Sequence, residues 1–361
     1  MKNILEKLFN TPCDMTKSEL AYLIENINDT ELQDIISFAD QQRQKYFQKR
    51  VYMRALIEFS SFCAQNCLYC GIRAQNRNAE RYRLSLQQIL ECCELAYNLD
   101  YRTFVLQSGE DFTYSTDDIC HMVRTIKNKF PDCAITLSIG EKTYEEYLAY
   151  YQAGADRYLL RHEAASRRLY EYIHPPQMSY DNRQQCLYNL KEIGYQTGAG
   201  FMVGLPTQTA EDLAEDILFI RELQPHMVGI GPFIHHKDTP FKDEKSGSLR
   251  QTLLMIALTR ITLPQALLPA TTALGSLDIV GREKGLAAGA NVVMPNVSPK
   301  DVRAKYLLYD GKICTGDEDA ECRMCIAGKM TMWGFTPDLQ RGDHPTKIPS
   351  NLTFENQQEL I

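Results

Sequence analysis

The sequence lacks the features that direct a protein to a membrane or to nucleic acid. No uninterrupted apolar stretch approaches the roughly 18 residues that cross a bilayer, and residues 1–5 lack the apolar core of a secretory signal. No basic run with interleaved aromatic residues is present, and the formal net charge is −7, which argues against a nucleic-acid-binding surface. These absences predict a cytoplasmic protein that has neither a membrane nor a nucleic acid as a partner.

The chain also has no need of covalent cross-links for its size. Its 361 residues are 44% hydrophobic and 24% charged, which is enough to bury a large core. The twelve cysteines therefore do not indicate the disulfides of a small secreted domain. Six are scattered and fit core or surface thiols, and six fall into two clusters, which fits a reducing compartment.

The first cysteine cluster, C-x3-C-x2-C, comprises Cys63, Cys67 and Cys70, directly after a strand-like run at 51–60. Thiolates this close on one loop are typical ligands of an iron–sulfur cluster. Three ligands leave the fourth iron of a cubane open, so that it can bind another molecule. The alternatives are unrelated thiols or a zinc site, although structural zinc usually takes four ligands, often from paired C-x2-C elements.

From residue 51 onward, short apolar runs alternate with helical patterns. Eight runs predict strands: residues 51–60, 103–108, 134–139, 157–162, 198–204, 227–233, 267–273 and 290–295. Alternation of apolar strands with helices predicts an α/β fold with parallel pairing, and eight units predict a closed (β/α)8 barrel of the TIM type. An open six-stranded partial barrel is the alternative. The predicted division is a helical segment at 1–50, the barrel at 51–310 and an extension at 311–361.

Polar residues and glycines gather where the predicted strands end. Examples are Ser108-Gly109-Glu110 after the second strand, Arg161-His162-Glu163 at the fourth and Thr271-Thr272 at the seventh. The active site of a (β/α)8 barrel lies at the carboxyl ends of its strands. Because buried polar atoms without partners cost free energy, the convergence of several such ends predicts a functional site there.

A second cysteine cluster, C-x7-C-x2-C, follows the barrel and comprises Cys314, Cys322 and Cys325. The same ligand count makes it a candidate for a second iron–sulfur cluster. The alternatives are a peripheral metal site and free thiols.

The first cysteine motif, with Tyr69 before its last cysteine, resembles the signature of the radical S-adenosylmethionine (SAM) superfamily. Longer stretches resemble one family within it, the HydE maturases of FeFe-hydrogenase: residues 57–60, 66–71, 81–83, 105–111, 136–138, 153–163, 194–200, 202–206, 227–233, 269–272 and 291–296. The resemblance implies that a 4Fe-4S cluster reductively cleaves SAM to a 5'-deoxyadenosyl radical. It further implies that this radical acts on an iron–cysteine complex carrying CO and cyanide, during assembly of the diiron subcluster of the hydrogenase H-cluster.

The resemblance also implies roles for individual residues. Cys63, Cys67 and Cys70 would hold the catalytic cluster. The residues implied to bind SAM are Tyr69, Ser108, Gly109, Glu110, Glu163, Arg183, Met202 and Leu205. The residues implied to line the substrate cavity are Thr136, Ser138, Arg161, Met227, Thr271, Thr272 and Tyr306. A cationic Arg161 suits an anionic substrate, whereas Arg183 has the alternative of an exposed arginine on a helix.

The implied partners are the other hydrogenase maturases and an electron donor such as ferredoxin or flavodoxin. Two other functions stay open at this point. Biotin synthase and methylornithine synthase, from the same superfamily, act on small organic substrates. A non-enzymatic iron–sulfur carrier would also suit two cysteine triads, but it needs neither Ser108-Gly109-Glu110 nor Glu163, and it should not bind SAM.

Overall fold

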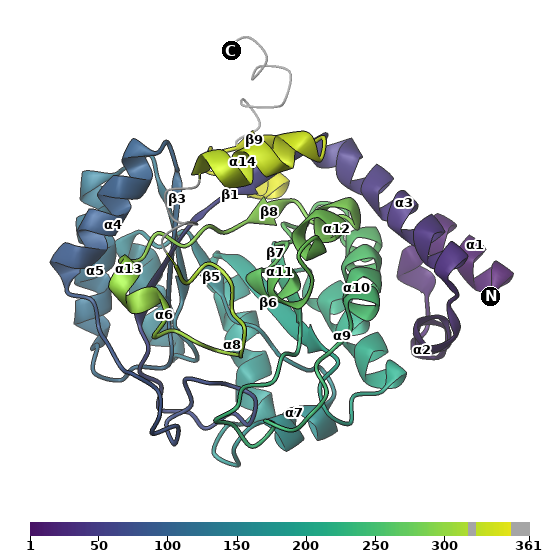
Figure 1. Ribbon diagram of the computed structural model, residues 1–361, viewed down its shortest axis with the longest axis horizontal. Helices are drawn as coiled ribbons and strands as arrows, with labels where there is room; N and C mark the ends of the chain where they lie inside the picture. Colours follow the sequence, from purple (N-terminus) through teal and green to yellow (C-terminus); the bar gives the residue numbers. More distant parts are fainter. Residues whose placement is uncertain (317–322, 348–361) are drawn as a thin grey trace, which may run out of the picture.

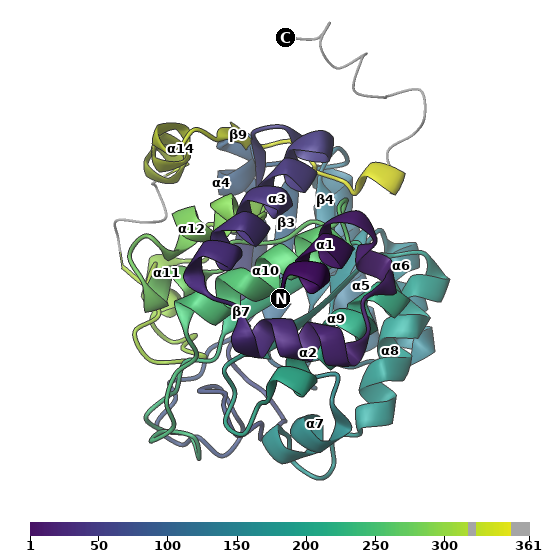
Figure 2. The ribbon, with the colours of Figure 1, turned by 90° about the vertical axis from the view of Figure 1, so that its right-hand side faces the viewer.

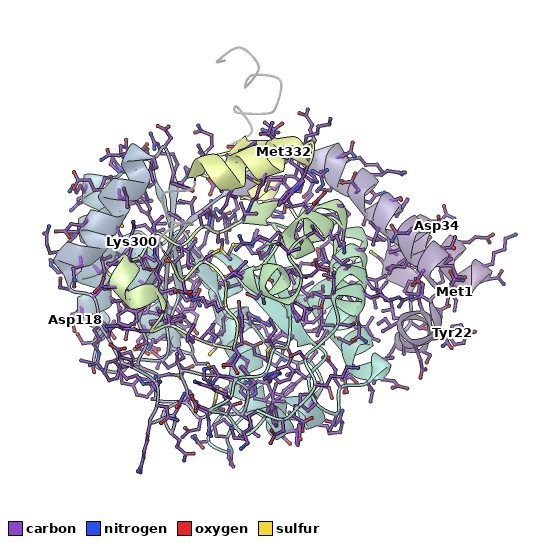
Figure 3. All side chains as sticks on the ribbon, in the orientation of Figure 1. Met1, Tyr22, Asp34, Asp118, Lys300 and Met332 are labelled. Atoms are coloured by element: carbon purple, nitrogen blue, oxygen red, sulfur yellow. The ribbon has the colours of Figure 1, made fainter. Side chains whose placement is uncertain are left out.

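The computed structural model describes residues 1–316 and 323–347. In these two ranges no helix combines the length and the apolar character that crossing a bilayer requires. Helices surround a central set of strands (Figure 1). Side chains fill the interior of the molecule, and exposed residues such as Tyr22, Asp118 and Met332 lie at its surface (Figure 3).

Three helices precede the barrel: α1 (Lys2–Asn10), α2 (Lys17–Asn26) and α3 (Asp29–Phe47). α2 begins with a capping box, in which the Thr16 and Glu19 side chains each accept a hydrogen bond from the other residue's backbone amide. α2 packs against α9 (Ala210–Leu223), and α3 packs against α10 (Leu249–Thr262). These N-terminal helices therefore lie on the outside of the barrel (Figure 2).

Strands and helices alternate along the rest of the chain, as predicted. The strands are β1 (Arg50–Met53), β2 (Ala55–Ser60), β3 (Thr103–Ser108), β4 (Ala134–Ser138), β5 (Arg157–Leu159), β6 (Gln196–Val203), β7 (Met227–Pro232), β8 (Val292–Val293) and β9 (Thr336–Asp338). The other helices are α4 (Leu86–Asn98), α5 (Thr116–Lys129), α6 (Tyr144–Ala153), α7 (Arg167–Ile173), α8 (Tyr180–Ile193), α11 (Thr272–Leu277), α12 (Gly281–Ala287), α13 (Lys300–Arg303) and α14 (Arg323–Met332). β2 to β7 form one parallel sheet in chain order, as right-handed β–α–β crossovers produce.

The barrel closes through its seventh predicted strand, residues 267–273, which is irregular. It forms only two isolated parallel bridges, from Leu267 to Met227 of β7 and from Pro269 to Val292 of β8. A proline has no amide hydrogen to donate, so Pro269 interrupts regular pairing here. β8 then pairs with β1, and Asn296 bridges to Leu56 of β2. The TIM-type barrel is therefore confirmed, while the division of the chain at residues 50 and 310 remains a prediction.

The C-terminal extension closes the amino end of the barrel. β9 pairs in parallel with β1 on the edge opposite to β8. Beyond β9, the Arg341 carbonyl accepts hydrogen bonds from Thr103 Oγ1 and Arg157 Nη2. Asp343 Oδ1 accepts from Arg157 Nη2 at 2.6 Å and from Gln196 Nε2 at 2.7 Å. Because Arg157 is fully buried, Asp343 supplies the carboxylate that compensates its charge.

We expect Asp343→Ala to lower the free energy of unfolding by about 3–5 kcal/mol, because it leaves the Arg157 charge buried and unpaired. Denaturant titration checks this, with Asp132→Ala as the control. Asp132 pairs with Arg102 but is half exposed, at 48%, so its loss should cost less than about 1 kcal/mol. Equal losses in the two variants would contradict the prediction.

The same ion pair predicts a pH dependence. Burial opposes ionisation of Asp343, but the Arg157 and Arg341 charges outweigh it and hold its pKa well below the usual range. A lowered folded-state pKa contributes stability that is present above the ordinary carboxyl pKa of about 3.9 and is lost as the pH falls below it. Acidification from pH 5 should therefore destabilise the wild type more than Asp343→Asn.

Candidate active site

The loop after β2 carries the three clustered cysteines and is held by many backbone contacts. Cys63, Cys67 and Cys70 are free and partly buried. The Arg81 guanidinium donates to the carbonyls of four loop residues: Ser61, Ile72, Arg73 and Asn76. The Ala64 amide donates to the Glu110 carbonyl at 2.9 Å, beyond the end of β3. The three thiols thus lie on a fixed loop at the carboxyl ends of the strands, where the sequence places the site.

The three thiols are close enough to influence one another. Burial is the main cause that raises the pKa of each, and Cys63 adds to the effect at both Cys67 and Cys70, where the pKa of Cys70 reaches about 12. Among the described residues, no three His, Cys, Asp or Glu side chains are placed to hold one metal ion. Each thiolate of a cubane binds a different iron, so three separate thiols on one loop suit such a cluster.

Ser108, Gly109 and Glu110 connect the end of β3 to the cysteine loop. A Cβ at Gly109 would lie 2.4 Å from the Phe62 carbonyl oxygen and 2.6 Å from Cys63 Cβ, so only glycine fits here without displacement. The Glu110 carboxylate accepts from Gln65 Nε2 at 2.6 Å and from the Glu141 amide at 3.1 Å. The close approach that requires glycine is therefore made to the protein's own loop.

Glu163 has the features of a residue held for binding. Its φ is +66°, a left-handed conformation that costs a residue with a side chain roughly 1–2 kcal/mol. Its Oε2 lies 3.1 Å from Arg161 Nη2, yet both atoms are buried and neither has a hydrogen-bond partner. Unpartnered buried polar groups of this kind are rare in folded proteins. Glu163 and Arg161 therefore keep hydrogen-bonding capacity for a ligand.

Arg183 is not an exposed helix arginine, because only 5% of its surface is accessible. Its Nε donates to Glu141 Oε1 and its Nη1 to the Arg161 carbonyl, both at 2.6 Å. Burial disfavours its charge, but Tyr170 and the carboxylates of Glu141 and Glu110 keep its pKa raised. The guanidinium is thus charged and fixed beside Arg161.

The residues expected beside adenine share one small apolar cluster. Tyr69, Met202 and Leu205 pack together with Phe233 and Phe241, apart from the main core. The Tyr69 hydroxyl lies 3.2 Å from His174 Nε2, which fixes the ring. The structure therefore brings an aromatic residue of the cysteine loop against the end of β6.

The barrel interior is open beside Gly229 of β7. Large branched residues usually fill this space. Val228 and Ile230 belong to the core between sheet and helices, so Gly229, between them, faces the interior. A Cβ at Gly229 would have no neighbour closer than 3.9 Å, and Arg161 Cδ lies 4.0 Å away. Space for a ligand therefore adjoins Arg161.

The other residues predicted for the substrate lie at different depths. Thr136 Oγ1 is buried without a hydrogen-bond partner. Ser138 is the last residue of the same strand, β4. Thr271 Oγ1 would lie 3.1 Å from a Cβ at Gly231, so it borders the open space.

Three more residues of this predicted set already have partners. Thr272 Oγ1 accepts from Arg282 Nη2 at 3.2 Å, and the Tyr306 hydroxyl accepts from Gln107 Nε2 at 3.4 Å. Met227 starts β7 at the amino end, where its Sδ contacts Arg54 Nη1 at 3.2 Å. Met227 therefore lies at the amino end of its strand, away from the carboxyl ends where the cysteine loop lies.

Of the second cysteine cluster, only Cys314 is described with its side chain. Its Sγ lies 3.5 Å from Arg282 Nη2, the same atom that contacts Thr272. Cys322 and the side chain of Cys325 lie outside the described residues. A second iron–sulfur cluster thus remains a prediction.

Two carboxylates, the partly buried Glu141 and the buried Glu58, make contacts that the sequence did not predict. Glu141 joins Glu110 to Arg183, because its amide donates to Glu110 and its carboxylate accepts from Arg183. Glu58 of β2 accepts from Lys312 Nζ at 2.6 Å and from Asn296 Nδ2 at 2.8 Å. A charged residue inside an apolar strand was the available signal for Glu58, and a carboxylate at the end of the third predicted strand was the signal for Glu141.

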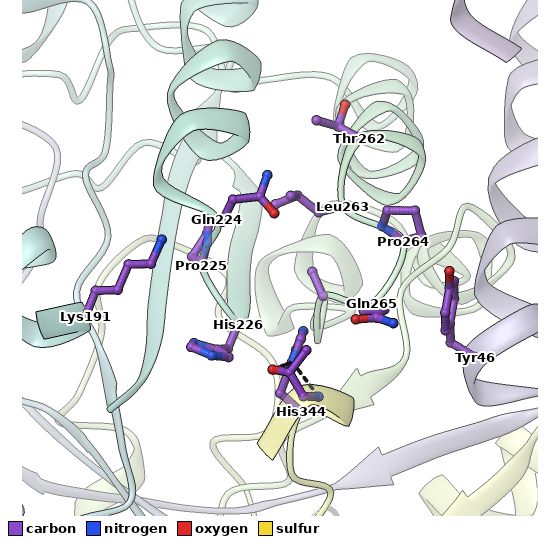
Figure 4. A pocket seen from close by; sticks show the side chains of 12 residues that line it. Tyr46, Lys191, Gln224, Pro225, His226, Thr262, Leu263, Pro264, Gln265 and His344 are labelled. Carbon is purple, nitrogen blue, oxygen red and sulfur yellow. Dashed lines mark hydrogen bonds between the residues drawn. The ribbon is translucent and has the colours of Figure 1, made fainter. Parts of the chain in front are cut away.

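A pocket of about 300 Å³ lies at the opposite end of the barrel. Residues just before β7 and residues 262–266, just before the seventh predicted strand, line it. Its lining includes Lys191, His226 and His344 (Figure 4). None of the predicted site residues lines it. Because (β/α)8 barrels place their chemistry at the carboxyl ends of the strands, this pocket is not the candidate active site.

Known proteins similar to this chain agree with the geometry. The sequence profile of the Radical SAM superfamily matches residues 57–220. The chain is 47% identical over 342 residues to the FeFe hydrogenase maturase subunit HydE of Thermotoga maritima, a match that covers 94% of this chain and 97% of that protein. It is 28% identical over 308 residues to the 3-methylornithine synthase of Methanosarcina acetivorans, with 84% and 86% covered. The crystal structure of methylornithine synthase (PylB) has a TM-score of 0.80 at 24% identity, covering 93% of this chain and 97% of that one.

We expect Gly109→Ala to reduce the iron and sulfide bound after anaerobic reconstitution by at least about half, because the added methyl group must displace the Cys63 segment. Iron analysis and the visible absorption of the cluster measure this. Gly229→Ala is the matched control, since a Cβ there meets no atom within 3.9 Å. Full cluster content in the Gly109 variant would refute the packing argument.

Proposed function

Because the chain belongs to the HydE family within the radical SAM superfamily, we propose that it matures FeFe-hydrogenase by acting on an iron–cysteine complex that carries CO and cyanide. The chain is a radical SAM enzyme, and enzymes of this superfamily use a 4Fe-4S cluster and SAM. In the proposed reaction, a bond would form between C5' of the 5'-deoxyadenosyl radical and the cysteine sulfur of that complex, the Fe–S bond would break, and the iron would be reduced by one electron. The resulting iron species would enter assembly of the diiron subcluster of the H-cluster.

The residues of the strand ends suit these cofactors. Cys63, Cys67 and Cys70 would hold the 4Fe-4S cluster, with the fourth iron open to SAM. When bound and reduced, the cluster and SAM together supply the 5'-deoxyadenosyl radical. Glu163 Oε2 has no hydrogen-bond partner and would accept hydrogen bonds from ribose hydroxyls, while the fixed Arg183 would meet the carboxylate of SAM.

The remaining contacts to SAM would come from the strand ends and the apolar cluster. Tyr69, Met202 and Leu205 would enclose the adenine ring, because they share one apolar cluster. Glu110 would face the methionine ammonium with its negative charge, in the stretch that Ser108 and Gly109 begin.

One observation carries the proposal for the substrate. Arg161 presents buried Nε and Nη2 groups without hydrogen-bond partners, next to the space that Gly229 leaves open. The guanidinium lies in an ion pair with Glu163, but its unfilled hydrogen-bond donors favour an anionic or cyanide-bearing ligand, because a ligand acceptor would restore the missing hydrogen bonds. The cavity would be completed by Thr136, Ser138, Thr271, Thr272, Tyr306 and Met227.

Membership of this family places the chain among the hydrogenase maturases that work together. We propose a ferredoxin or flavodoxin as its electron donor. We also propose the cytoplasm as its location, since the described cysteines are all free thiols and free thiols persist in reducing compartments.

A small organic substrate is the second candidate function. The 28% identity to a 3-methylornithine synthase favours it, since the barrel and the cysteine loop suit either chemistry. Stimulation of SAM cleavage by ornithine-type or biotin-precursor substrates, without stimulation by an iron–cysteine complex, would support it. A non-enzymatic carrier would bind no SAM.

We expect the reconstituted and dithionite-reduced protein to form 5'-deoxyadenosine from SAM, and the Cys63→Ala, Cys67→Ala and Cys70→Ala variants to form at least about a hundredfold less, because each removes a cluster ligand. Chromatography of the products measures this. Cys13→Ala, at an exposed cysteine outside the site, should retain the wild-type rate. Absence of both SAM binding and cleavage in the wild type, with the candidate iron–cysteine complex added, would move the carrier function ahead.

We further expect Gly229→Val to reduce the stimulation of SAM cleavage by the iron–cysteine substrate at least about tenfold, because its side chain would occupy the space beside Arg161. SAM binding should stay within about twofold of wild type, since this space is separate from the apolar cluster proposed for adenine. Gly229→Ala should give an intermediate effect. Unchanged stimulation in the valine variant would show that the substrate binds elsewhere.

A further inference from the structure

A buried histidine–aspartate pair lies behind the Arg161–Glu163 segment. His162 and Asp216 are both fully buried, and His162 Nε2 lies 3.2 Å from Asp216 Oδ1. Asp216 belongs to α9, and the His162 ring also packs on Phe219 of that helix. His162 therefore faces away from the barrel interior, as strand alternation predicts, and it has no access to a ligand.

The pair fixes both ends of the segment that presents Glu163. Asp216 Oδ1 also accepts from the Ala165 amide at 2.7 Å. His162 Nδ1 accepts from the Gly200 amide at 3.3 Å, while the Gly200 carbonyl accepts from the Glu163 amide at 3.0 Å. Residues on both sides of Glu163 are thus tied to β6 and α9, while Glu163 itself has the unfavourable φ of +66°.

The hydrogen bonds assign the protons of the pair. Since Nδ1 accepts an amide hydrogen, the His162 proton is on Nε2 and points at Asp216. Burial lowers the pKa of His162 to about 3 and raises the pKa of Asp216 above its usual range. Asparagine at 216 would reproduce the Oδ1 acceptor that meets both His162 Nε2 and the Ala165 amide.

We propose that His162 and Asp216 are positioning residues that hold Glu163 in its left-handed conformation, so that its carboxylate is directed at the ribose of SAM. Without the pair, the segment can relax to an ordinary backbone conformation, which withdraws Glu163 Oε2 from the site. This inference rests on the proposed function. It gives the buried pair a role in SAM affinity rather than in the chemical step.

The test compares Asp216→Leu with Asp216→Asn in the reconstituted, full-length holoenzyme, with SAM as the probe. In the leucine variant, KM for SAM should rise roughly tenfold, the loss expected for one charge-assisted hydrogen bond, and kcat for 5'-deoxyadenosine should change less than about twofold. Asp216→Asn should restore the wild-type KM. His162→Leu, which keeps the Ala165 contact, should raise KM as well and serves if Asp216→Leu does not fold.

Asn291→Leu is the matched control for general loosening of the barrel. The Asn291 side-chain oxygen is also a buried acceptor for one backbone amide and one side chain, those of Leu268 and Arg260. Its loss should lower stability without a change in KM for SAM. An unchanged KM in both the Asp216 and His162 variants, or an equal rise in Asn291→Leu, would overturn the inference while wild-type SAM cleavage leaves the proposed function standing. A wild type that does not cleave SAM would overturn both.

Discussion

The barrel must accommodate charged side chains in its buried interior, and much of the structure serves that constraint. Arg157 and Glu58 are both almost fully buried, and a buried charge is costly unless it is paired. Asp343 pairs with Arg157 at the amino end, and Lys312 pairs with Glu58 nearer the carboxyl ends. Both partners come from the segment after residue 310. The segment after residue 310 therefore supplies the charges that compensate two buried charged residues of the barrel.

A second set of contacts joins the cysteine loop to the interior. Gln65 donates to Glu110, Glu110 accepts from the Glu141 amide, and the Glu141 carboxylate accepts from Arg183. Arg183 in turn donates to the Arg161 carbonyl. This chain of hydrogen bonds fixes the positions expected to bind the cluster, SAM and the substrate relative to one another. Such preorganisation reduces the reorganisation that a reaction would otherwise require.

Several buried polar atoms in this network have no hydrogen-bond partner. Arg161 Nε and Nη2, Glu163 Oε2 and Thr136 Oγ1 are buried without hydrogen-bond partners, although neighbouring charges such as Arg183 are satisfied. Gly229 of β7 leaves room beside Arg161. This is the space in which we propose that the substrate binds.

The sequence by itself determined the α/β alternation, the barrel and the three-cysteine loop, because periodicity and cysteine spacing are local properties of the chain. It also placed Glu163 and Arg161 at a strand end. Only the tertiary structure decided that Arg183 is buried, that Glu141 links it to Glu110, and that the seventh strand is reduced to two bridges. These features depend on side chains that meet across strands far apart in the sequence, and no local pattern encodes which buried charges find partners and which are left for a ligand.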